Sequence, residues 1–296
     1  MKMNFSKIFA SLILLIGTLP NHLQADGMVY KVSKGPNHLY LAGTLHLLRG
    51  SDYPLPVEYE TAYRDSKVIG YEIDPDLMAT PDAQAAIMKS MMLPKGEALH
   101  QKLAPETYKA LVEYANTQGL SKLVLDGMKP SAAILIVAVT GLGKLGVTPD
   151  KGIEMFYNLK ANSDKKQEFS LETLAYQLDI MMGMAEGQED AAVRYTLESM
   201  KTLEKDFDNM VSAWRKGNGS ALHEMISAMM EKEYPKMYDR LIVKRNKEWI
   251  PQIKEKLATP AVETILVGAA HLAGPDSVIA MLKKEGYTIT QLQTSN

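Results

Sequence analysis

The sequence predicts an α/β protein of the α+β kind, in which strands from both ends of the chain form one mixed central sheet around a large helical insert. Two observations lead to this prediction. Short β-prone runs gather near the two ends, whereas the centre shows apolar residues spaced by three and four, as in helices. In addition, an apolar strand followed by Gly-x-x-His occurs once near each end, which suggests two pseudo-symmetric half-sites on a shared sheet.

The strands are predicted from alternating or continuous apolar runs that end at turn residues. Residues 29–41 contain two such runs around Gly-Pro-Asn, a pattern typical of a hairpin. Residues 67–73, KVIGYEI, form a second apolar strand that ends at an Asp-Pro-Asp turn. Near the other end, residues 262–267 predict a strand, residues 275–285 a helix and residues 287–293 a last strand.

The centre is predicted to be helical, interrupted by one short strand over residues 168–171. The predicted helices span residues 81–92, 105–118, 152–161, 174–184, 190–215, 220–232 and 238–257. The most apolar segment of the centre, residues 131–139, is too short to cross a bilayer, so we expect a buried helix there.

The first 25 residues have the layout of a secretory signal peptide. Lys2 and Lys7 precede an apolar run over residues 8–19, and Ala25 offers a small residue for cleavage. A retained N-terminal anchor is the alternative, but the run is short for a membrane span. We therefore expect cleavage after Ala25, a single domain over residues 26–296, no stable membrane span afterwards, and a periplasmic or secreted protein.

The composition excludes several classes of function. Hydrophobic residues make up 46% of the chain, enough for a packed core, and the net charge of −2 argues against nucleic acid as a partner. The chain has no cysteine, which excludes disulfides, thiolate catalysis and cysteine-bound zinc or iron–sulfur clusters. A metal ion would therefore be held by His, Asp or Glu.

The two Gly-x-x-His segments are the strongest candidates for a site. They run from Gly43 to His46 and from Gly268 to His271, each after an apolar strand. Glycine allows a close approach of the backbone, and the carboxyl edge of a parallel sheet is where ligands bind. A single such histidine would be read more simply as one satisfied by a backbone carbonyl, but the repetition favours a metal ligand or general base.

Glu72 is the third candidate, because it ends an otherwise apolar strand. A carboxylate there is costly unless it is paired in a salt bridge or bound to a cation. His46, Glu72 and His271 would form a three-ligand set with an open position, suited to a divalent ion such as Mn²⁺, Co²⁺ or Zn²⁺. The helical His-Glu-x-x-His motif is absent, so a common zinc-protease site is not expected.

Arg245 and Glu172 complete the candidates. Arg245, on a predicted helix with Trp249 on the same face, would clamp a substrate carboxylate or stabilise an oxyanion; the alternative is a solvated basic face. A metal-held Glu72 cannot also serve freely as a base. Glu172 is therefore the best second acid–base group, unless it only serves a helix dipole.

Five blocks of this chain resemble, in order, the TraB/GumN family, which includes the Tiki proteins. They are LYLAGTLHLLRGSDYPLP, KVIGYEID, GVTPDKGIEMFYNLKANSDKKQEFSLETLAYQLDIM, RLIVKRNKEWIPQIKEKL and TILVGAAHLAGPDSVIAMLKKEGYTI. The resemblance covers nearly the whole mature chain. It implies a metal-dependent, peptidase-like site, with His46, Glu72 and His271 at the motif positions.

The expected function is therefore an exported metal-dependent hydrolase, peptidase-like, that acts on a peptide or small-molecule substrate. His46, Glu72 and His271 would hold the metal, and Glu72, Glu172 and Arg245 would serve catalysis. One alternative is a non-catalytic protein that binds or sequesters a peptide or small ligand. A weaker one is haem binding through His46 or His271.

Overall fold

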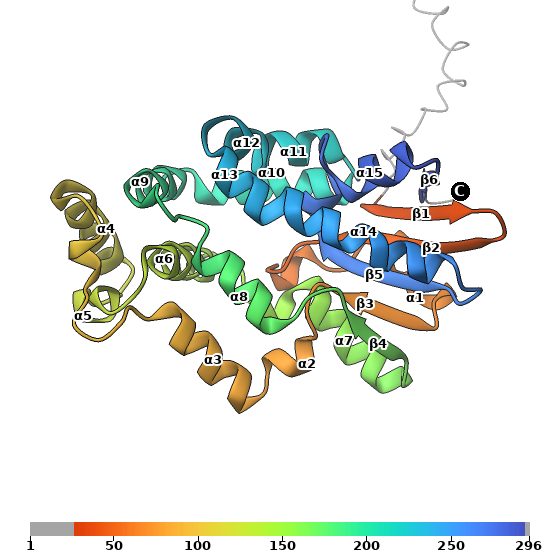
Figure 1. Ribbon diagram of the computed structural model, residues 1–296, viewed down its shortest axis with the longest axis horizontal. Coiled ribbons are helices and arrows are strands. Elements are labelled where there is room, and N and C mark those ends of the chain that lie inside the picture. The colour runs from red at the N-terminus through yellow and green to blue at the C-terminus, as the bar shows by residue number, and fades with distance from the viewer. Residues whose placement is uncertain (1–26, 294–296) are drawn as a thin grey trace, which may run out of the picture.

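A six-stranded mixed sheet lies at the centre of the computed structural model, which describes residues 27–293 (Figure 1). The strand order is β4-β3-β5-β2-β1-β6, where β4, β3, β5 and β2 run parallel and β1 is antiparallel to both its neighbours. The strands are β1 (Val29–Lys34), β2 (Asn37–Thr44), β3 (Val68–Tyr71), β4 (Gln167–Ser170), β5 (Glu263–Gly268) and β6 (Thr288–Gln291). The predicted mixed sheet built from both ends of the chain is confirmed.

The N-terminal hairpin of β1 and β2 turns at Gly35, whose φ of 66° lies in the left-handed region that glycine adopts most easily. The C-terminal strand β6 pairs with β1, so β6 is the edge strand of the sheet beside the N-terminal hairpin. The predicted signal peptide, residues 1–25, lies outside the described residues.

Helices fill the chain between β3 and β5 and also flank the strands. The α-helices are α1 (Val57–Asp65), α2 (Pro75–Met78), α3 (Pro81–Met91), α4 (Pro105–Thr117), α5 (Lys122–Asp126), α6 (Pro130–Lys144), α7 (Ile153–Asp164), α8 (Leu174–Met182), α9 (Glu189–Ser199), α10 (Leu203–Arg215), α11 (Gly219–Ile226), α12 (Ala228–Glu233), α13 (Pro235–Tyr238), α14 (Lys244–Leu257) and α15 (Val278–Lys284). Figure 1 shows a helical lobe, formed by α3 to α6, α8 and α9, that extends away from the sheet.

The apolar side chains form two buried clusters, one around the sheet and one inside the helical lobe. This division explains why the predicted helix over residues 190–215 is wrong. The segment breaks between α9 and α10, because α9 contributes Ala192 and Val193 to the lobe, whereas α10 contributes Phe207, Val211 and Trp214 to the sheet cluster. One straight helix could not bury both faces against two separate clusters. The predicted helix over 220–232 is likewise divided into α11 and α12.

The apolar segment around residues 131–139 lies in α6, which buries Ala132, Ala133, Ile134 and Val137 in the protein. This confirms the buried helix expected from its length. Within residues 27–293, none of the helices combines the length and apolar character that crossing a membrane requires.

The topology places both Gly-x-x-His segments at one edge of the sheet. β2 and β5 are parallel neighbours, with Thr44 opposite Gly268. His46 follows β2 by two residues, and His271 lies in the short 3₁₀ helix η5 (Ala269–Leu272) that follows β5. Because parallel neighbours end at the same edge, the two histidines leave the sheet side by side.

Candidate active site

His46 is held from one side by a carboxylate. Its Nδ1 lies 2.8 Å from Oε1 of Glu154, and the hydroxyl of Thr44 donates to the same carboxylate oxygen. Glu154 stands in the first turn of α7, which approaches the loop after β2 so closely that a Cβ on Gly152 would lie 2.2 Å from the carbonyl oxygen of His46. The imidazole therefore points Nδ1 at Glu154, and 56% of its side chain is exposed.

His271 is held from both sides. Its Nδ1 lies 2.7 Å from Oδ1 of Asn246, and its Nε2 lies 2.9 Å from Nη1 of Arg245. An arginine only donates hydrogen bonds, so Nε2 must be the acceptor and Nδ1 must carry the proton. The ring lies 4.4 Å from the ring of Trp249, centroid to centroid, and the residue is 4% exposed. The tautomer and orientation of His271 are therefore fixed.

Glu72 follows β3 directly and lies between the two Gly-x-x-His segments. Its Oε1 accepts a hydrogen bond of 2.6 Å from the amide of Gly268, and its Oε2 accepts one of 2.5 Å from Nη2 of Arg245. Its Oε1 also lies 3.9 Å from Nε2 of His271. Both oxygens of this buried carboxylate are therefore hydrogen-bonded, as expected for a charged group at the end of an apolar strand.

Arg245 is the centre of the buried network. Its Nε donates to Glu172 over 2.7 Å, Nη2 donates to Glu72 and Glu172, and Nη1 donates to His271 and to the carbonyl of Leu241. The five N–H groups of a guanidinium therefore all have partners among the described residues. Arg245 lies on α14, one residue before Asn246, so the same helix turn holds both ring nitrogens of His271.

Glu172 binds Nε and Nη2 of Arg245, whereas His271 binds Nη1. Besides the two bonds from Arg245, its Oε1 accepts a bond of 3.0 Å from the indole N–H of Trp249. Its side chain is only 2% exposed. Burial raises the pKa of Glu172, against the opposing attraction of Arg245.

The electrostatics of Glu72 and Arg245 follow from their contact. Burial raises the pKa of Glu72, but the attraction of Arg245 and of the two histidines outweighs it and lowers the pKa to about 2. Burial lowers the pKa of Arg245, but Glu72 and Glu172 raise it well above its usual range. The pair is therefore ionised at neutral pH, and Glu72 is a carboxylate.

The pKa values of the two histidines are shifted in opposite directions. Attraction by Glu154 is the largest influence on His46, and it raises the pKa of that imidazole to about 9, although the partial burial of the ring and the charge of Arg245 oppose it. Burial lowers the pKa of His271 to about 3, and the nearby Arg245 adds to this effect. His271 is therefore neutral, whereas His46 favours its protonated form next to Glu154.

Gly268 is the point where the candidate residues converge. A Cβ on this residue would lie 3.1 Å from Nε2 of His46 and 3.2 Å from Oε1 of Glu72. Any side chain here would occupy the space between the imidazole and the carboxylate. The glycine thus keeps a small cradle open between His46 and Glu72, beside His271.

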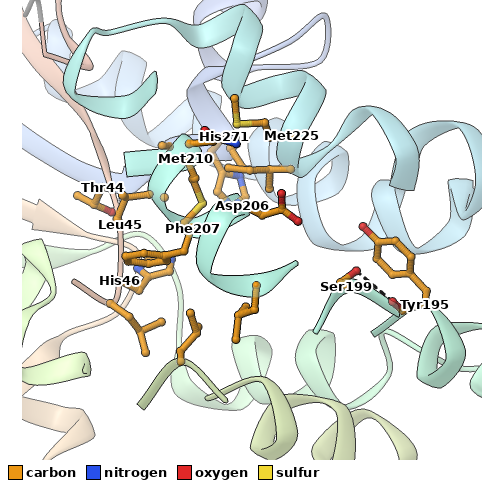
Figure 2. A pocket seen from close by; sticks show the side chains of 18 residues that line it. Thr44, Leu45, His46, Tyr195, Ser199, Asp206, Phe207, Met210, Met225 and His271 are labelled. Carbon is orange, nitrogen blue, oxygen red and sulfur yellow. Dashed lines mark hydrogen bonds between the residues drawn. The ribbon is translucent and has the colours of Figure 1, made fainter. Parts of the chain in front are cut away.

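A cavity of about 550 Å³ opens next to this cradle (Figure 2). His46 and His271 both line it, and most of its remaining wall is apolar. The apolar lining residues are Leu45, Leu47, Leu142, Leu203, Phe207, Met210, Met225, Ile226, Ala269 and Ala270. Figure 2 shows Tyr195 and Ser199 at the end of the cavity opposite His46. The carboxylate of Asp206 is the acidic group in this lining.

The structure brings all five predicted site residues together. His46 and Glu72 lie next to Gly268, and His271 lies 3.9 Å from Glu72. Arg245 binds Glu72 and also Glu172. Their chemical roles stay predictions. Glu154 was not predicted, because a glutamate in the first turn of a helix is explained equally well by the helix dipole. The local signal that could have found it is Gly152, two residues earlier, where the backbone of α7 approaches the loop of His46.

The donor set fits a divalent cation in its chemistry. The carboxyl groups of Glu72, Glu154 and Glu172 and the two imidazoles offer oxygen and nitrogen atoms that suit a divalent ion, and the cradle at Gly268 lies between an imidazole nitrogen and a carboxylate oxygen. Arg245 holds the position between Glu72 and His271 in this arrangement. Within residues 27–293, three or more His, Asp or Glu side chains are nowhere grouped as they would be around an ion.

The fold and the site define a class: an α+β protein with paired Gly-x-x-His segments and a glutamate at the carboxyl edge of a mixed sheet. The sequence model of the TraB/PrgY/gumN family matches residues 28–291, and the chain belongs to this family. The resemblance seen in the five sequence blocks is therefore confirmed.

Among curated proteins, the chain is similar to the uncharacterized protein YbaP of Escherichia coli (strain K12). The two are 23% identical over 253 residues, which cover 84% of this chain and 89% of YbaP. The YbaP protein of Shigella flexneri is similar to the same extent, with 23% identity over 253 residues. No solved structure matches the chain significantly.

Proposed function

We propose that this protein is a metal-dependent hydrolase, peptidase-like, that acts outside the cytoplasm. One observation carries the proposal: His46 and His271 both have Nδ1 anchored by a side-chain oxygen and both line one cavity, and Glu72 lies next to His271 and, across Gly268, opposite His46. Second partners of this kind orient metal-binding imidazoles and fix their tautomer.

His46, Glu72 and His271 would hold a divalent ion such as Mn²⁺, Co²⁺ or Zn²⁺. When bound, such an ion polarises a carbonyl group of the substrate. Glu154 and Asn246 keep Nδ1 of each imidazole occupied, so that Nε2 is the nitrogen left to bind a ligand. In His271 this nitrogen accepts a hydrogen bond from Arg245, which would have to move before His271 could bind a metal ion.

Arg245 acts on the site through its neighbours. With all five of its N–H groups engaged, it keeps Glu72 ionised and aimed at Gly268, and it shields Glu72 from Glu172. Direct contact of Arg245 with substrate stays a prediction. So does the role of Glu172 as an acid–base group, since Arg245 and Trp249 occupy its oxygens.

The decisive experiment is a cleavage assay of the purified mature protein on a broad peptide library, with and without a chelator. We expect hydrolysis that a chelator abolishes and that Mn²⁺, Co²⁺ or Zn²⁺ restores. Glu72→Gln should abolish it, and Glu172→Gln should slow it. Hydrolysis that survives the chelator would contradict the metal-dependent proposal.

His46→Ala is the cleanest variant, because its side chain is more than half exposed and its removal should cost little stability. His100→Ala is the matched control, since His100 is also exposed and also paired with a carboxylate, that of Asp126. We expect His46→Ala to lose activity with a melting temperature close to that of His100→Ala. Equal activity of the two variants would remove His46 from the site.

A non-catalytic binding protein is the second candidate, and the full engagement of Arg245, Glu72 and Glu172 favours it. A buried polar network with every partner satisfied is rigid, which suits binding in the adjoining cavity as well as catalysis. Tight peptide binding without turnover, unchanged by chelator and by Glu72→Gln, would favour this candidate.

The location of the protein is part of the proposal and depends on residues 1–25. Lys2, Lys7 and the apolar run before Ala25 support export with cleavage. N-terminal sequencing of the exported protein should give a start at or near Asp26. Recovery of the intact chain with Met1 from a membrane fraction would contradict cleavage.

A further inference from the structure

The cavity beside the two histidines has a second, smaller cavity next to it. This inner cavity has a volume of about 180 Å³ and lies in the helical part of the protein, between α6, α9 and the segment from α11 to the π-helical turn at Leu241. Tyr195 and Ile226 line both cavities. The two cavities are therefore neighbours, and Tyr195 and Ile226 lie at the boundary between them.

The walls of the two cavities are mostly apolar and contain several methionines. Met210 and Met225 line the outer cavity, and Met184, Met230 and Met237 line the inner one. Methionine side chains are unbranched and adapt to the shape of an apolar partner. Tyr195 and Met225 remain 36% and 47% exposed, so the passage presents large apolar groups to solvent.

The inner cavity offers little to a peptide main chain. Its side-chain hydrogen-bonding groups are the hydroxyls of Tyr195, Tyr234 and Thr196, and the hydroxyl of Thr196 already donates to the carbonyl of Ala192 over 2.9 Å. Each residue of a peptide would bring one N–H and one C=O that need partners. An unbranched hydrocarbon chain brings none, and it gains free energy with each methylene that leaves water.

We propose that the two cavities together form a channel for one long, unbranched acyl chain, whose carbonyl end lies at His46 and His271. The substrate class would be an acylated amine or amino acid. This inference rests on the proposed function for the reaction at the carbonyl group. The binding of the chain itself is independent of turnover.

The test is the binding of N-octanoyl, N-decanoyl and N-dodecanoyl glycinamide, measured by calorimetry below their micelle concentrations and with a chelator present. Burial of each added methylene should tighten Kd about fourfold until the channel is full. A negative heat-capacity change should accompany binding. A Kd that does not depend on chain length would overturn the proposal.

Ile226→Trp should close the passage, so that the gain from decanoyl to dodecanoyl disappears while octanoyl glycinamide still binds. Met229→Trp is the matched control, because Met229 lies three residues away, is 46% exposed and lines neither cavity. If Ile226→Trp does not fold, Thr196→Leu narrows the inner cavity from α9. Chain-length dependence that is unchanged in the narrowed variant would also overturn the channel.

The outcomes separate this inference from the proposed function. Length-dependent binding without hydrolysis of any acyl or peptidyl substrate would uphold the channel and contradict the hydrolase. Hydrolysis of peptides together with length-independent acyl binding would uphold the hydrolase and contradict the channel.

Discussion

Replacement of Arg245 by methionine should destabilise the protein by about 3–5 kcal/mol, the usual cost of leaving a buried charge without its partner. Two carboxylates depend on this guanidinium, and the side chains of Glu72 and Glu172 are only 6% and 2% exposed. Methionine keeps the apolar stem that packs near Trp249, so the change removes mainly the charge and its hydrogen bonds.

The loss should appear as a fall in melting temperature of about 6–20 °C, since 1 kcal/mol corresponds to about 2–4 °C in a chain of this size. It should also depend on pH. In the wild type, the lowered pKa of Glu72 gives stability that is present above its unfolded pKa and lost only as pH falls toward about 2. Without Arg245, burial favours the protonated acids instead. The gap between variant and wild type should therefore narrow toward about pH 4.

Arg240→Met is the matched control for these melts. Arg240 also bridges two carboxylates, Asp179 and Glu186, but these side chains are 76% and 77% exposed. Loss of such a surface pair should cost less than about 1 kcal/mol. A similar fall in melting temperature for the two arginine variants, or a cost below about 1 kcal/mol for Arg245→Met, would refute the reasoning.

The same variant tests whether the site accepts an ion. With Arg245 gone, the acidic cluster has no buried cation, so Mn²⁺ or Zn²⁺ should raise the melting temperature of Arg245→Met more than that of the wild type. Binding at a concentration 100-fold above Kd would return about 2.7 kcal/mol. If neither ion raises the melting temperature of Arg245→Met, the freed carboxylates and imidazole do not form a metal site.

Three further changes test the geometry. Gly152→Ala should disturb the loop of His46 and lower activity, because the added Cβ would lie 2.2 Å from that residue's carbonyl oxygen; a fully active alanine variant would disprove the close packing. Asn246→Ala should cost about 1–3 kcal/mol in chemical denaturation, because it leaves Nδ1 of buried His271 without its acceptor. Glu263→Gln should stabilise the protein, and the gain should grow as pH rises above the pKa of Glu263 in the unfolded chain. The reason is that Oε2 of Glu263 lacks a hydrogen-bond partner among the described residues and that burial raises the pKa of this carboxyl group. Folding therefore opposes the ionisation of Glu263. Melts that show no gain at neutral pH would contradict this.

Much of the fold was predictable because the strands are marked by short-range patterns. The hairpin turn at Gly35, the apolar run before Glu72 and the strand before Gly268 each carry a local signal. The break between α9 and α10 carries none. It arises because two separate apolar clusters divide the helices between them, and that division exists only in the folded protein.

The site was predictable to the extent that its residues violate a local rule. An unpaired carboxylate at the end of an apolar strand is costly, so the sequence around Glu72 predicted a partner for it. The repeated Gly-x-x-His pattern indicated His46 and His271. The identity of the partner was not predictable. Arg245 lies in a helix with neighbouring lysines, and only the tertiary packing of α14 turns it from solvent toward Glu72.

The two half-sites share a backbone device but differ in what surrounds each imidazole. A carboxylate holds Nδ1 of His46, and its side chain remains exposed toward the cavity. A neutral amide holds Nδ1 of His271, and Arg245 takes its other nitrogen, so that ring is buried and neutral. His46 is thus the histidine that a ligand can reach from the cavity without breaking the hydrogen bonds of Arg245. His271 becomes available only when Arg245 moves, and Arg245 is held by Glu72 and Glu172. We therefore expect a ligand to occupy the site first at His46, and we expect any involvement of His271 to require a rearrangement of the ion pairs around Arg245.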